Sequence, residues 1–585
     1  MSVAGRATPP SSPVAPTHQQ RQVIDADGNF LLLACPGSGK TRSAAHRAAR
    51  LVTPPSPTRV AVCSYTNVGA QRLAAVLAAE HGITLAERHF LGTIHSFLLR
   101  YVVYPFAHLR GAQRGPTVRD GGWPDIPVLG DNTKRLSIDQ FRFRADGSLV
   151  LTGKPRTIPD SDEDILASVQ REVVRRKGQM FRASGALSPD DAMWVALQLL
   201  RSSPDLCSSV ASRFDELILD EAQDTSELQL ACVEQLRGSG QLTSLVMIGD
   251  LEQSIYSFQG ASAEGCRDLA ATSGLRTIVL DENHRSSQHI CDIAVHFSSR
   301  ERADRAVGPH AACPIRPEVV LYPPSDPQAC MQLFRDRLRY HRIAAASAAV
   351  LARNGTMADL LNGADTSLQL RERARTLGRI AGKIATSTLT RHDVEAVERI
   401  VAYCALDATQ LDDLDETQRH QVRRSSFRLL DTLPAARGDL AVWMRATAAA
   451  LQTAAEAVAK PVQHTGARML PTSAAATGRE TSTAFAASPP HPQAQTVHSI
   501  KGEDRDAVMV VIRRPHAADP GSQMELWEAA ADGTTINEDK QEERRVLFVA
   551  LTRAQRFCLV AFPDDQRGRR VATACLELGF VRAPH

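Results

Sequence analysis

The 585-residue sequence has few aromatic residues, only 5% of the total, and it lacks several patterns that identify common protein classes. No stretch approaches the roughly 18 consecutive apolar residues of a transmembrane helix, which argues against an integral membrane protein. Residues 1–16 are rich in Pro, Ser and Ala, which predicts a disordered tail. They lack the basic and apolar segments of a secretory signal, so we expect a cytoplasmic protein.

The eleven cysteines include no CxxC pair. Their scatter argues against a structural zinc site, an iron–sulfur cluster or a disulfide framework, and it favours reduced thiols. Charge is nearly balanced, with 68 Lys and Arg against 65 Asp and Glu, so the net charge of +3 neither demands nor excludes nucleic acid. The length is a prior for several domains of ~150 residues each.

Short apolar segments that end in polar residues alternate with helical stretches. They lie at 30–34, 59–63, 214–219, 244–248 and 277–280, and later at 507–512 and 557–562. Continuous apolar strands that alternate with helices are typical of parallel α/β sheets. Ligands of such sheets bind beyond the carboxyl ends of the strands, where these segments place their polar residues.

Residues 34–41 follow the first apolar segment and read Ala-Cys-Pro-Gly-Ser-Gly-Lys-Thr. The pattern fits a P-loop, whose glycines let backbone N–H groups turn toward phosphate oxygens at the start of a helix. Lys40 can reach the β- and γ-phosphates, and Thr41 can hold Mg²⁺. The expected nucleotide-binding residues of this loop are Pro36, Gly37, Ser38, Gly39, Lys40 and Thr41.

A second motif, Asp-Glu-Ala-Gln-Asp at 220–224, ends another predicted strand. Asp220 can bind the same Mg²⁺ as Thr41, and Glu221 can polarise the attacking water. A solvated acidic loop is the plainer interpretation of an isolated Asp-Glu pair, but it is weak at a strand end that follows a P-loop. Together the two motifs predict hydrolysis of ATP or GTP.

Eight short stretches occur in order along nearly the whole chain. They are 17–21, 64–67, 92–97, 220–224, 249–261, 283–286, 496–503 and 543–554. In this order they resemble the Q motif and motifs Ia, Ib, II, III, IV, V and VI of the superfamily 1A DNA helicases of the UvrD/Rep/PcrA family. The resemblance implies an α/β fold with two RecA-like P-loop NTPase domains in tandem, each with an inserted, mostly helical subdomain.

The expected domain boundaries combine this resemblance with local composition. In chain order they are a tail at 1–16, a first RecA-like domain at 17–100 and 187–276 around an insertion at 101–186, a second RecA-like domain at 277–356 and 493–585, a helical insertion at 357–462, and a flexible linker at 463–492.

The resemblance implies a set of contacts to ATP. Gln20 is expected to read adenine, and Arg42 and His284 to stack on it. The ribose contact is expected from Glu503, with Asp504 as the alternative. Gln253 is expected to sense the γ-phosphate.

Arg285 and Arg553 are expected to reach the γ-phosphate from the second domain. Arginines that cross a cleft neutralise transition-state charge, worth ~10³–10⁵ in rate elsewhere, and they make cleft closure depend on ATP. The expected catalytic residues are therefore Lys40, Asp220, Glu221, Gln253, Arg285 and Arg553.

For single-stranded DNA, Tyr65, Tyr256 and Phe258 match positions where the family stacks rings on bases. Each such stack is worth ~1–3 kcal/mol and tolerates any base. Core packing is the plainer interpretation, but the scarcity of aromatics in this chain favours function. Backbone contacts are expected from Thr66, Thr93, His95 and His498.

The favoured function is an ATP- and Mg²⁺-dependent DNA helicase and translocase that moves 3′ to 5′ on single-stranded or tailed DNA. RNA stays open as a substrate, since stacking does not distinguish sugars. A separate nuclease or repair protein is an expected partner, and no membrane association is expected.

The alternative is a DNA-binding regulatory ATPase subunit of a repair or phage-defence complex, like the Gabija helicase subunit, with little unwinding of its own. Gln259 in place of the family's usual arginine, His284 in place of its tyrosine, and the reduced helical insertion motivate it. A P-loop kinase or GTPase would leave the motifs outside the nucleotide site unexplained.

Overall fold

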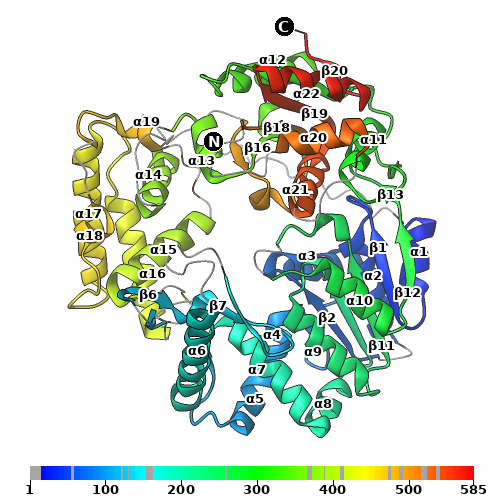
Figure 1. Cartoon of the computed structure of the whole chain (residues 1–585), viewed down its shortest axis with the longest axis vertical. Coiled ribbons are helices and arrows are strands. Elements are labelled where there is room, and N and C mark those ends of the chain that lie inside the picture. The colour runs from blue at the N-terminus through cyan, green and yellow to red at the C-terminus, as the bar shows by residue number, and fades with distance from the viewer. Residues whose placement is uncertain are drawn as a thin grey trace, which may run out of the picture.

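The computed structural model contains two parallel sheets covered by helices, with two inserted segments beside them (Figure 1). It describes residues 15–54, 58–119, 123–128, 131–152, 163–256, 260–364, 372–385, 387, 389, 391–408, 411, 414, 416–471, 476–485, 492–514, 523–534 and 540–584. Most of the predicted tail lies outside these ranges, as do the predicted DNA contact Phe258 and Gln259, the residue that replaces the family's usual arginine. No helix among the described residues is long and apolar enough to cross a bilayer.

The first sheet has the strand order β12-β1-β11-β10-β2-β3 and is parallel throughout. Its strands are β1 (Phe30–Ala34), β2 (Val60–Ser64), β3 (Phe90–Thr93), β10 (Glu216–Asp220), β11 (Ser244–Gly249) and β12 (Arg276–Leu280). Alternate residues of these strands point to opposite faces. Leu32 and Val62 pack with α2 (Lys40–Val52) and α3 (Asn67–His81), in the same core as α1 (His18–Asp25). Leu31 and Cys63 belong to the core on the other face.

That second core is built from the helices that follow the first insertion. They are α7 (Pro189–Ser202), α8 (Pro204–Ala211), α9 (Glu227–Gly238) and α10 (Ala263–Thr272). Both faces of the sheet are therefore buried, as the continuous apolar strands predict.

The second sheet has the order β17-β16-β18-β19-β15-β20 and is also parallel. Its strands are β15 (Glu318–Tyr322), β16 (Ala348–Ala352), β17 (Ala494–Thr496), β18 (Arg505–Val511), β19 (Ala554–Pro563) and β20 (Val581–Arg582). One face packs on α11 (Gln288–Ala294), α20 (Gln523–Asp532), α21 (Gln541–Leu551) and α22 (Gln566–Glu577). The other packs on α12 (Ala329–Tyr340) and α13 (Gly355–Leu361). The two parallel sheets confirm the predicted fold class.

The boundary predicted at residue 277 is wrong by one strand. β12 pairs with β1 from Phe30↔Arg276 to Ala34↔Leu280, so it completes the first sheet. Leu280 is buried in the same core as Phe30, which accounts for this placement. The chain crosses to the second sheet only afterwards, through a small sheet of β13 (Glu282–Asn283) and β14 (Arg305–Ala306).

The first insertion leaves the first sheet after α4 (Ile94–Leu98) and α5 (Tyr104–Phe106). It contains the pairs β4 (Thr117–Val118) with β9 (Ala186–Leu187), β5 (Asp125–Val128) with β6 (Asp131–Ser137), and β7 (Phe141–Phe143) with β8 (Leu149–Leu151). The long helix α6 (Glu163–Ser184) packs on these hairpins through Val169 and Val173.

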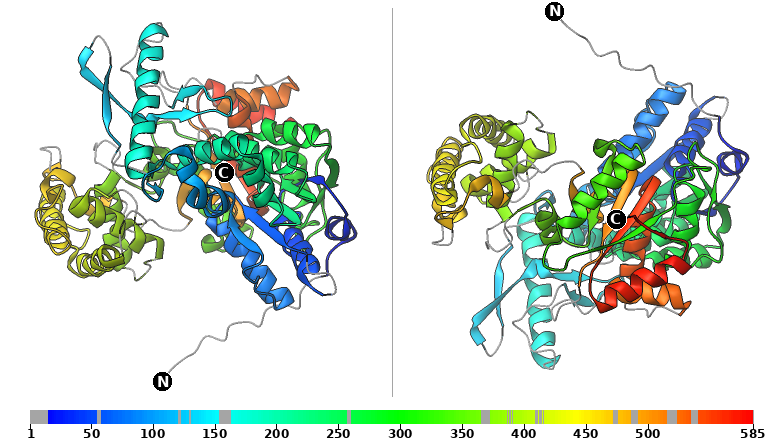
Figure 2. Two further views of the ribbon diagram at one scale, coloured as in Figure 1. Left: turned by 90° about the horizontal axis from the view of Figure 1, so that it is seen from below. Right: turned by 90° about the horizontal axis from the view of Figure 1, so that it is seen from above.

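The second insertion is a helical subdomain that stands to one side of the two α/β units (Figure 2). Its helices are α14 (Glu372–Ala385), α15 (Arg391–Leu406), α16 (Glu416–Thr432), α17 (Leu440–Glu456), α18 (Gly466–Met469) and α19 (Thr481–Phe485). The last two fall within 463–492, the stretch predicted to be a flexible linker. Met469, Leu470 and Phe485 are buried in the helical core, so the described part of this stretch belongs to the subdomain, and that prediction is wrong there.

Candidate functional site

The carboxyl ends of three central strands of the first sheet bring the predicted nucleotide residues together. The P-loop follows β1, the 220–224 motif ends β10, and η5 (Leu251–Gln253) follows β11. The 496–503 segment and α21 of the second α/β unit face them, as the contacts below establish. The candidate site is therefore the junction between the two α/β units, at the position where parallel sheets bind their ligands.

The P-loop is held in shape by glycine and by Gln20. Gly37 and Gly39 have φ values of 71° and 82°, in the left-handed region that favours glycine. Gln20 is buried against the loop: its amide donates to the Ser38 carbonyl at 2.9 Å and accepts from the Thr17 N–H at 3.1 Å. Both ends of the Gln20 amide therefore contact protein, and its contact to adenine stays a prediction.

The side-chain oxygens of Thr41 and Asp220 lie next to each other, and both are of the type that Mg²⁺ prefers as ligands. The Thr41 hydroxyl donates to Asp220 Oδ2 at 3.0 Å, while the buried Oδ1 of Asp220 has no hydrogen-bond partner among the described residues. Burial, and then the neighbouring Glu221 carboxylate, raise the pKa of Asp220 to about 7. A cation at Oδ1 would satisfy this orphaned oxygen and favour the ionised carboxylate.

The ion would need ligands from outside the protein as well. Among the described residues there is no cluster of three His, Cys, Asp or Glu side chains suited to hold a metal. Phosphate oxygens and waters usually complete the Mg²⁺ shell at nucleotide sites.

Glu221 adopts an uncommon backbone conformation, with φ at 55°. Such a conformation in a residue other than glycine must be imposed by its surroundings. The Gln223 amide donates to Glu221 Oε2 at 2.5 Å. Burial raises the pKa of Glu221, but the charges of Lys40 and Lys501 outweigh it, so the pKa lies below its ordinary value. Glu221 is therefore an ionised carboxylate that can accept a proton from water.

Arg553 crosses from the second α/β unit to the first, whereas the side chain of Arg285 contacts Thr552 and Asp504 within the second unit. Arg553 Nη2 donates to Gln253 Oε1 at 3.1 Å, and Arg285 Nη1 donates to the Thr552 carbonyl at 3.3 Å. Burial, and then the charge of Arg285, lower the pKa of Arg553 to about 9. A buried guanidinium group and a partly buried one that repel each other favour an anion between them, which is the property expected of a phosphate site.

The residues expected to contact adenine and ribose are bonded mostly to other parts of the protein. Arg42 pairs with Glu80 at 2.8 Å, and the backbone N–H of His284 donates to the Gly37 carbonyl at 3.1 Å. The buried Nε2 of His284 has no hydrogen-bond partner among the described residues. Glu503 pairs with Arg505 at 2.6 Å and is half exposed, so its predicted ribose contact has no support from its present neighbours.

The predicted DNA residues fall into two groups. Tyr65, Tyr256 and His498 form an aromatic cluster, with ring centroids 5.8 Å apart for the first pair and 6.0 Å for the second. Thr66 and Thr93 lie at the ends of adjacent strands, but their hydroxyls cap α3 and α4. Those hydroxyls are thus already hydrogen-bonded.

His95, the remaining predicted DNA contact, is largely neutral. Burial lowers its pKa to about 4. It can offer a hydrogen bond to DNA but no charge at neutral pH.

Sequence reasoning missed the acid–base pairs that join the two units. Lys501 Nζ donates to Asp224 Oδ2 at 2.6 Å and to the Gln253 carbonyl at 2.7 Å, and it stands 4.5 Å from the Tyr256 ring centroid. Arg544 pairs with Glu252 at 2.8 Å. All of these residues lie inside the motif stretches, so opposite charges in successive motifs were the available signal.

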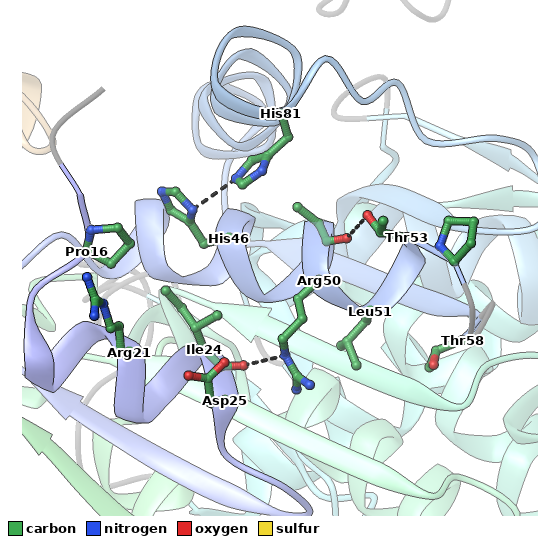
Figure 3. A pocket seen from close by; sticks show the side chains of 12 residues that line it. Pro16, Arg21, Ile24, Asp25, His46, Arg50, Leu51, Thr53, Thr58 and His81 are labelled. Carbon is green, nitrogen blue, oxygen red and sulfur yellow. Dashed lines mark hydrogen bonds between the residues drawn. The ribbon is translucent and has the colours of Figure 1, made fainter. Parts of the chain in front are cut away.

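A separate hollow of about 630 Å³ lies along α2, between α1 and α3 (Figure 3). Arg21, His46, Arg50 and His81 are among its lining residues, and His46 and His81 form a hydrogen bond of 2.9 Å across it. None of the predicted site residues lines this hollow.

The P-loop lies so close to Arg285 that residue 37 has no room for a side chain. A Cβ added at Gly37 would lie 2.5 Å from Arg285 Cβ and 2.8 Å from Asn283 Oδ1. Gly37→Ala should therefore push the loop away from 283–285 and weaken binding of a fluorescent ATP analogue at least about tenfold, or ~1.4 kcal/mol.

Gly28→Ala is the matched control, because Gly28 has a similar φ of 76° with nothing within 4 Å of its added Cβ. It should carry the same backbone strain of ~1–2 kcal/mol and bind the analogue as the wild type does. Equal affinities for the two variants would mean that the approach to Arg285 does not shape the nucleotide site.

Known proteins resemble about half of the chain. It is 25% identical to the ATP-dependent DNA helicase PcrA of Leuconostoc citreum over 284 residues, which cover 47% of this chain and 38% of that protein. It is 26% identical to the ATP-dependent DNA helicase UvrD1 of Mycobacterium leprae over 311 residues, 48% of this chain and 40% of the relative. For PcrA of Staphylococcus epidermidis the identity is 27% over 289 residues, 48% and 39% of the two chains.

The matched segment therefore spans only about two fifths of the length of each relative. Residues 16–272 match the family model of the UvrD/REP helicase N-terminal domain. This range contains the P-loop, the 220–224 motif and Gln253. Residues 16–272 of the chain are therefore similar to the N-terminal domain of the UvrD/REP helicases.

Proposed function

We propose that the chain is an ATP-dependent DNA helicase of the UvrD type, which moves 3′ to 5′ on single-stranded DNA and hydrolyses ATP in the interdomain cleft. One observation carries the proposal: Gln253 of the first α/β unit is bonded to Arg553 of the second, directly beside the P-loop and 220–224 motifs. The helicases named above support the choice of DNA as substrate.

The chemistry of the cleft follows from its charges. Lys40 and the N-terminus of α2 bind the phosphates, and Thr41 and Asp220 would hold Mg²⁺, which neutralises charge on the phosphate oxygens when it is bound. Glu221 accepts a proton from the attacking water. Arg285 and Arg553 stabilise the charge that develops on the γ-phosphoryl group.

Coupling to DNA uses the cluster of Tyr65, Tyr256 and His498. Bases would stack on the two tyrosines, and Lys501 joins Tyr256 to the Gln253 carbonyl. A base that displaces the Tyr256 ring would therefore shift Lys501 and, through it, the Gln253 backbone. Closure and opening of the cleft by ATP would then alternate the grip on the strand.

A regulatory ATPase subunit with little unwinding of its own is less well supported, because the relatives reported above are described as DNA helicases. The two proposals predict different behaviour on tailed duplexes.

The purified chain should unwind a duplex with a 3′ single-stranded tail, and a 5′-tailed duplex of the same sequence should stay paired. Tyr256→Ala should reduce unwinding, since one base stack of ~1–3 kcal/mol is lost. Tyr340→Ala is the control, because that side chain lies 71% exposed on α12. Failure on both tails, with ATP hydrolysis intact, would favour the regulatory subunit.

The assignment of catalytic roles makes a second prediction. Lys40→Ala should abolish ATP binding, because the cation that faces the phosphates is lost. Glu221→Gln should bind a fluorescent ATP analogue as the wild type does, yet hydrolyse ATP ~10²–10⁴-fold more slowly, the usual contribution of a positioned base. Normal hydrolysis by Glu221→Gln would show that another group activates the water.

A further inference from the structure

Arg300 lies outside every motif, yet its guanidinium bridges the two α/β units beside the P-loop. The residue follows Phe297, which is buried in the core of the second unit, and it stacks 5.2 Å from the ring centroid of Phe548 on α21. Nη1 binds both carboxylate oxygens of Asp304 at 2.7 Å. Nη2 reaches into the first unit.

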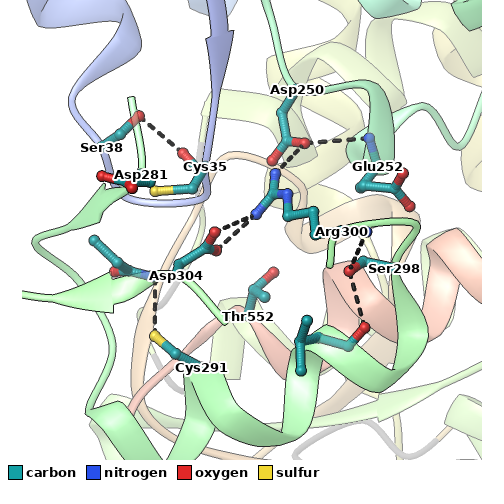
Figure 4. A network of polar contacts seen from close by, with 12 residues as sticks. Cys35, Ser38, Asp250, Glu252, Asp281, Cys291, Ser298, Arg300, Asp304 and Thr552 are labelled. Atoms are coloured by element: carbon teal, nitrogen blue, oxygen red, sulfur yellow. Dashed lines mark hydrogen bonds and ion pairs between the residues drawn. The ribbon is translucent and has the colours of Figure 1, made fainter. Parts of the chain in front are cut away.

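The partners of Nη2 are Asp250 and the start of the P-loop. Nη2 donates to Asp250 Oδ1 at 2.7 Å and to the Ala34 carbonyl at 3.3 Å. Figure 4 shows Arg300 between Asp250 and Asp304. Burial lowers the pKa of Arg300, but Asp250 and Asp304 outweigh burial and raise it above its ordinary value. Arg300 therefore stays charged.

The carboxylate of Asp250 connects Arg300 to Gln253 through hydrogen bonds. Asp250 is 1% exposed, so its charge needs a close cation. Its second oxygen, Oδ2, accepts from Gln253 Nε2 at 2.7 Å. Since Gln253 Oε1 accepts from Arg553, both ends of the Gln253 amide are fixed, and hydrogen bonds run without a break from Arg300 through Asp250 and Gln253 to Arg553.

The turn after β11 contacts the second unit at a second residue, Glu252. Glu252 pairs with Arg544 at 2.8 Å and accepts a hydrogen bond from Ser299, the residue before Arg300. The turn after β11 therefore depends on the second unit for its charge balance.

We propose that Arg300 and Asp250 are positioning residues that orient the Gln253 side chain for the γ-phosphate only while the two α/β units are docked. Undocking removes Arg300 from Asp250, leaves that carboxylate without its cation, and takes Arg553 away from Gln253 Oε1. The same guanidinium fixes the carbonyl of Ala34, so the start of the P-loop and Gln253 share one reference point. This inference rests on the proposed ATP hydrolysis.

The test is a double-mutant cycle on ATP hydrolysis by the full chain. Arg300→Met should lower kcat roughly a hundredfold, the effect of misplacing a catalytic group by about 1 Å, with the KM for ATP nearly unchanged. Gln253→Ala should lower kcat by a similar factor. Because Arg300 acts through Gln253, the double variant should be no slower than Gln253→Ala alone.

Two further variants guard against a loss of folding. Arg339→Met removes an arginine of the same unit that pairs with Asp336 at the surface, with 72% of its side chain exposed, and it should leave kcat unchanged. Arg300→Lys keeps the charge but cannot reach Asp250, Asp304 and Ala34 together, so its kcat should lie between those of Arg300→Met and the wild type.

The outcomes are separable. If the losses of the two single variants multiply in the double variant, or if Arg300→Met keeps the wild-type kcat, Arg300 does not act through Gln253. ATP hydrolysis by the wild-type chain would still support the proposed function in that case. A wild-type chain that hydrolyses no ATP would overturn the proposed function, and with it the positioning role of Arg300 and Asp250.

Discussion

The hydrogen bond from Arg553 to Gln253 joins the two α/β units at the point where the nucleotide would lie, and the rest of the site depends on it. Around it, Lys501 and Arg544 of the second unit pair with Asp224 and Glu252 of the first. Buried ions are costly without their partners. The units therefore cannot separate freely, and an open cleft must supply other partners, such as solvent, to these groups.

The charges in the cleft also explain why a nucleotide would belong there. Arg553 is buried and Arg285 is partly buried, and loss of hydration lowers the pKa of each. An anion between them would relieve this penalty, while Mg²⁺ would relieve the orphaned oxygen of Asp220. ATP with Mg²⁺ brings both charges at once. The proposed nucleotide would thus balance the charges contributed by both units.

Much of this site could be predicted from the sequence, because strand-turn-helix patterns are local. The P-loop and the Asp220–Glu221 pair follow from such patterns, and the resemblance to a known family adds Gln253, Arg285 and Arg553. β12 was assigned to the wrong unit, because an apolar segment does not reveal which sheet it joins. Residues 463–492 resemble a linker in composition, but composition does not show that Met469 and Phe485 are buried in the fold. Arg300 belongs to no motif, and only the folded chain brings it to Asp250.

We expect one network of contacts to couple the nucleotide site to the aromatic cluster of Tyr65 and Tyr256. The most direct test is the rate of ATP hydrolysis by the full chain, measured with and without single-stranded DNA and with Lys40→Ala as the blank. The account predicts that single strands strongly raise the rate, because Lys501 links Tyr256 to Gln253. A slow rate that is the same with and without DNA would contradict it.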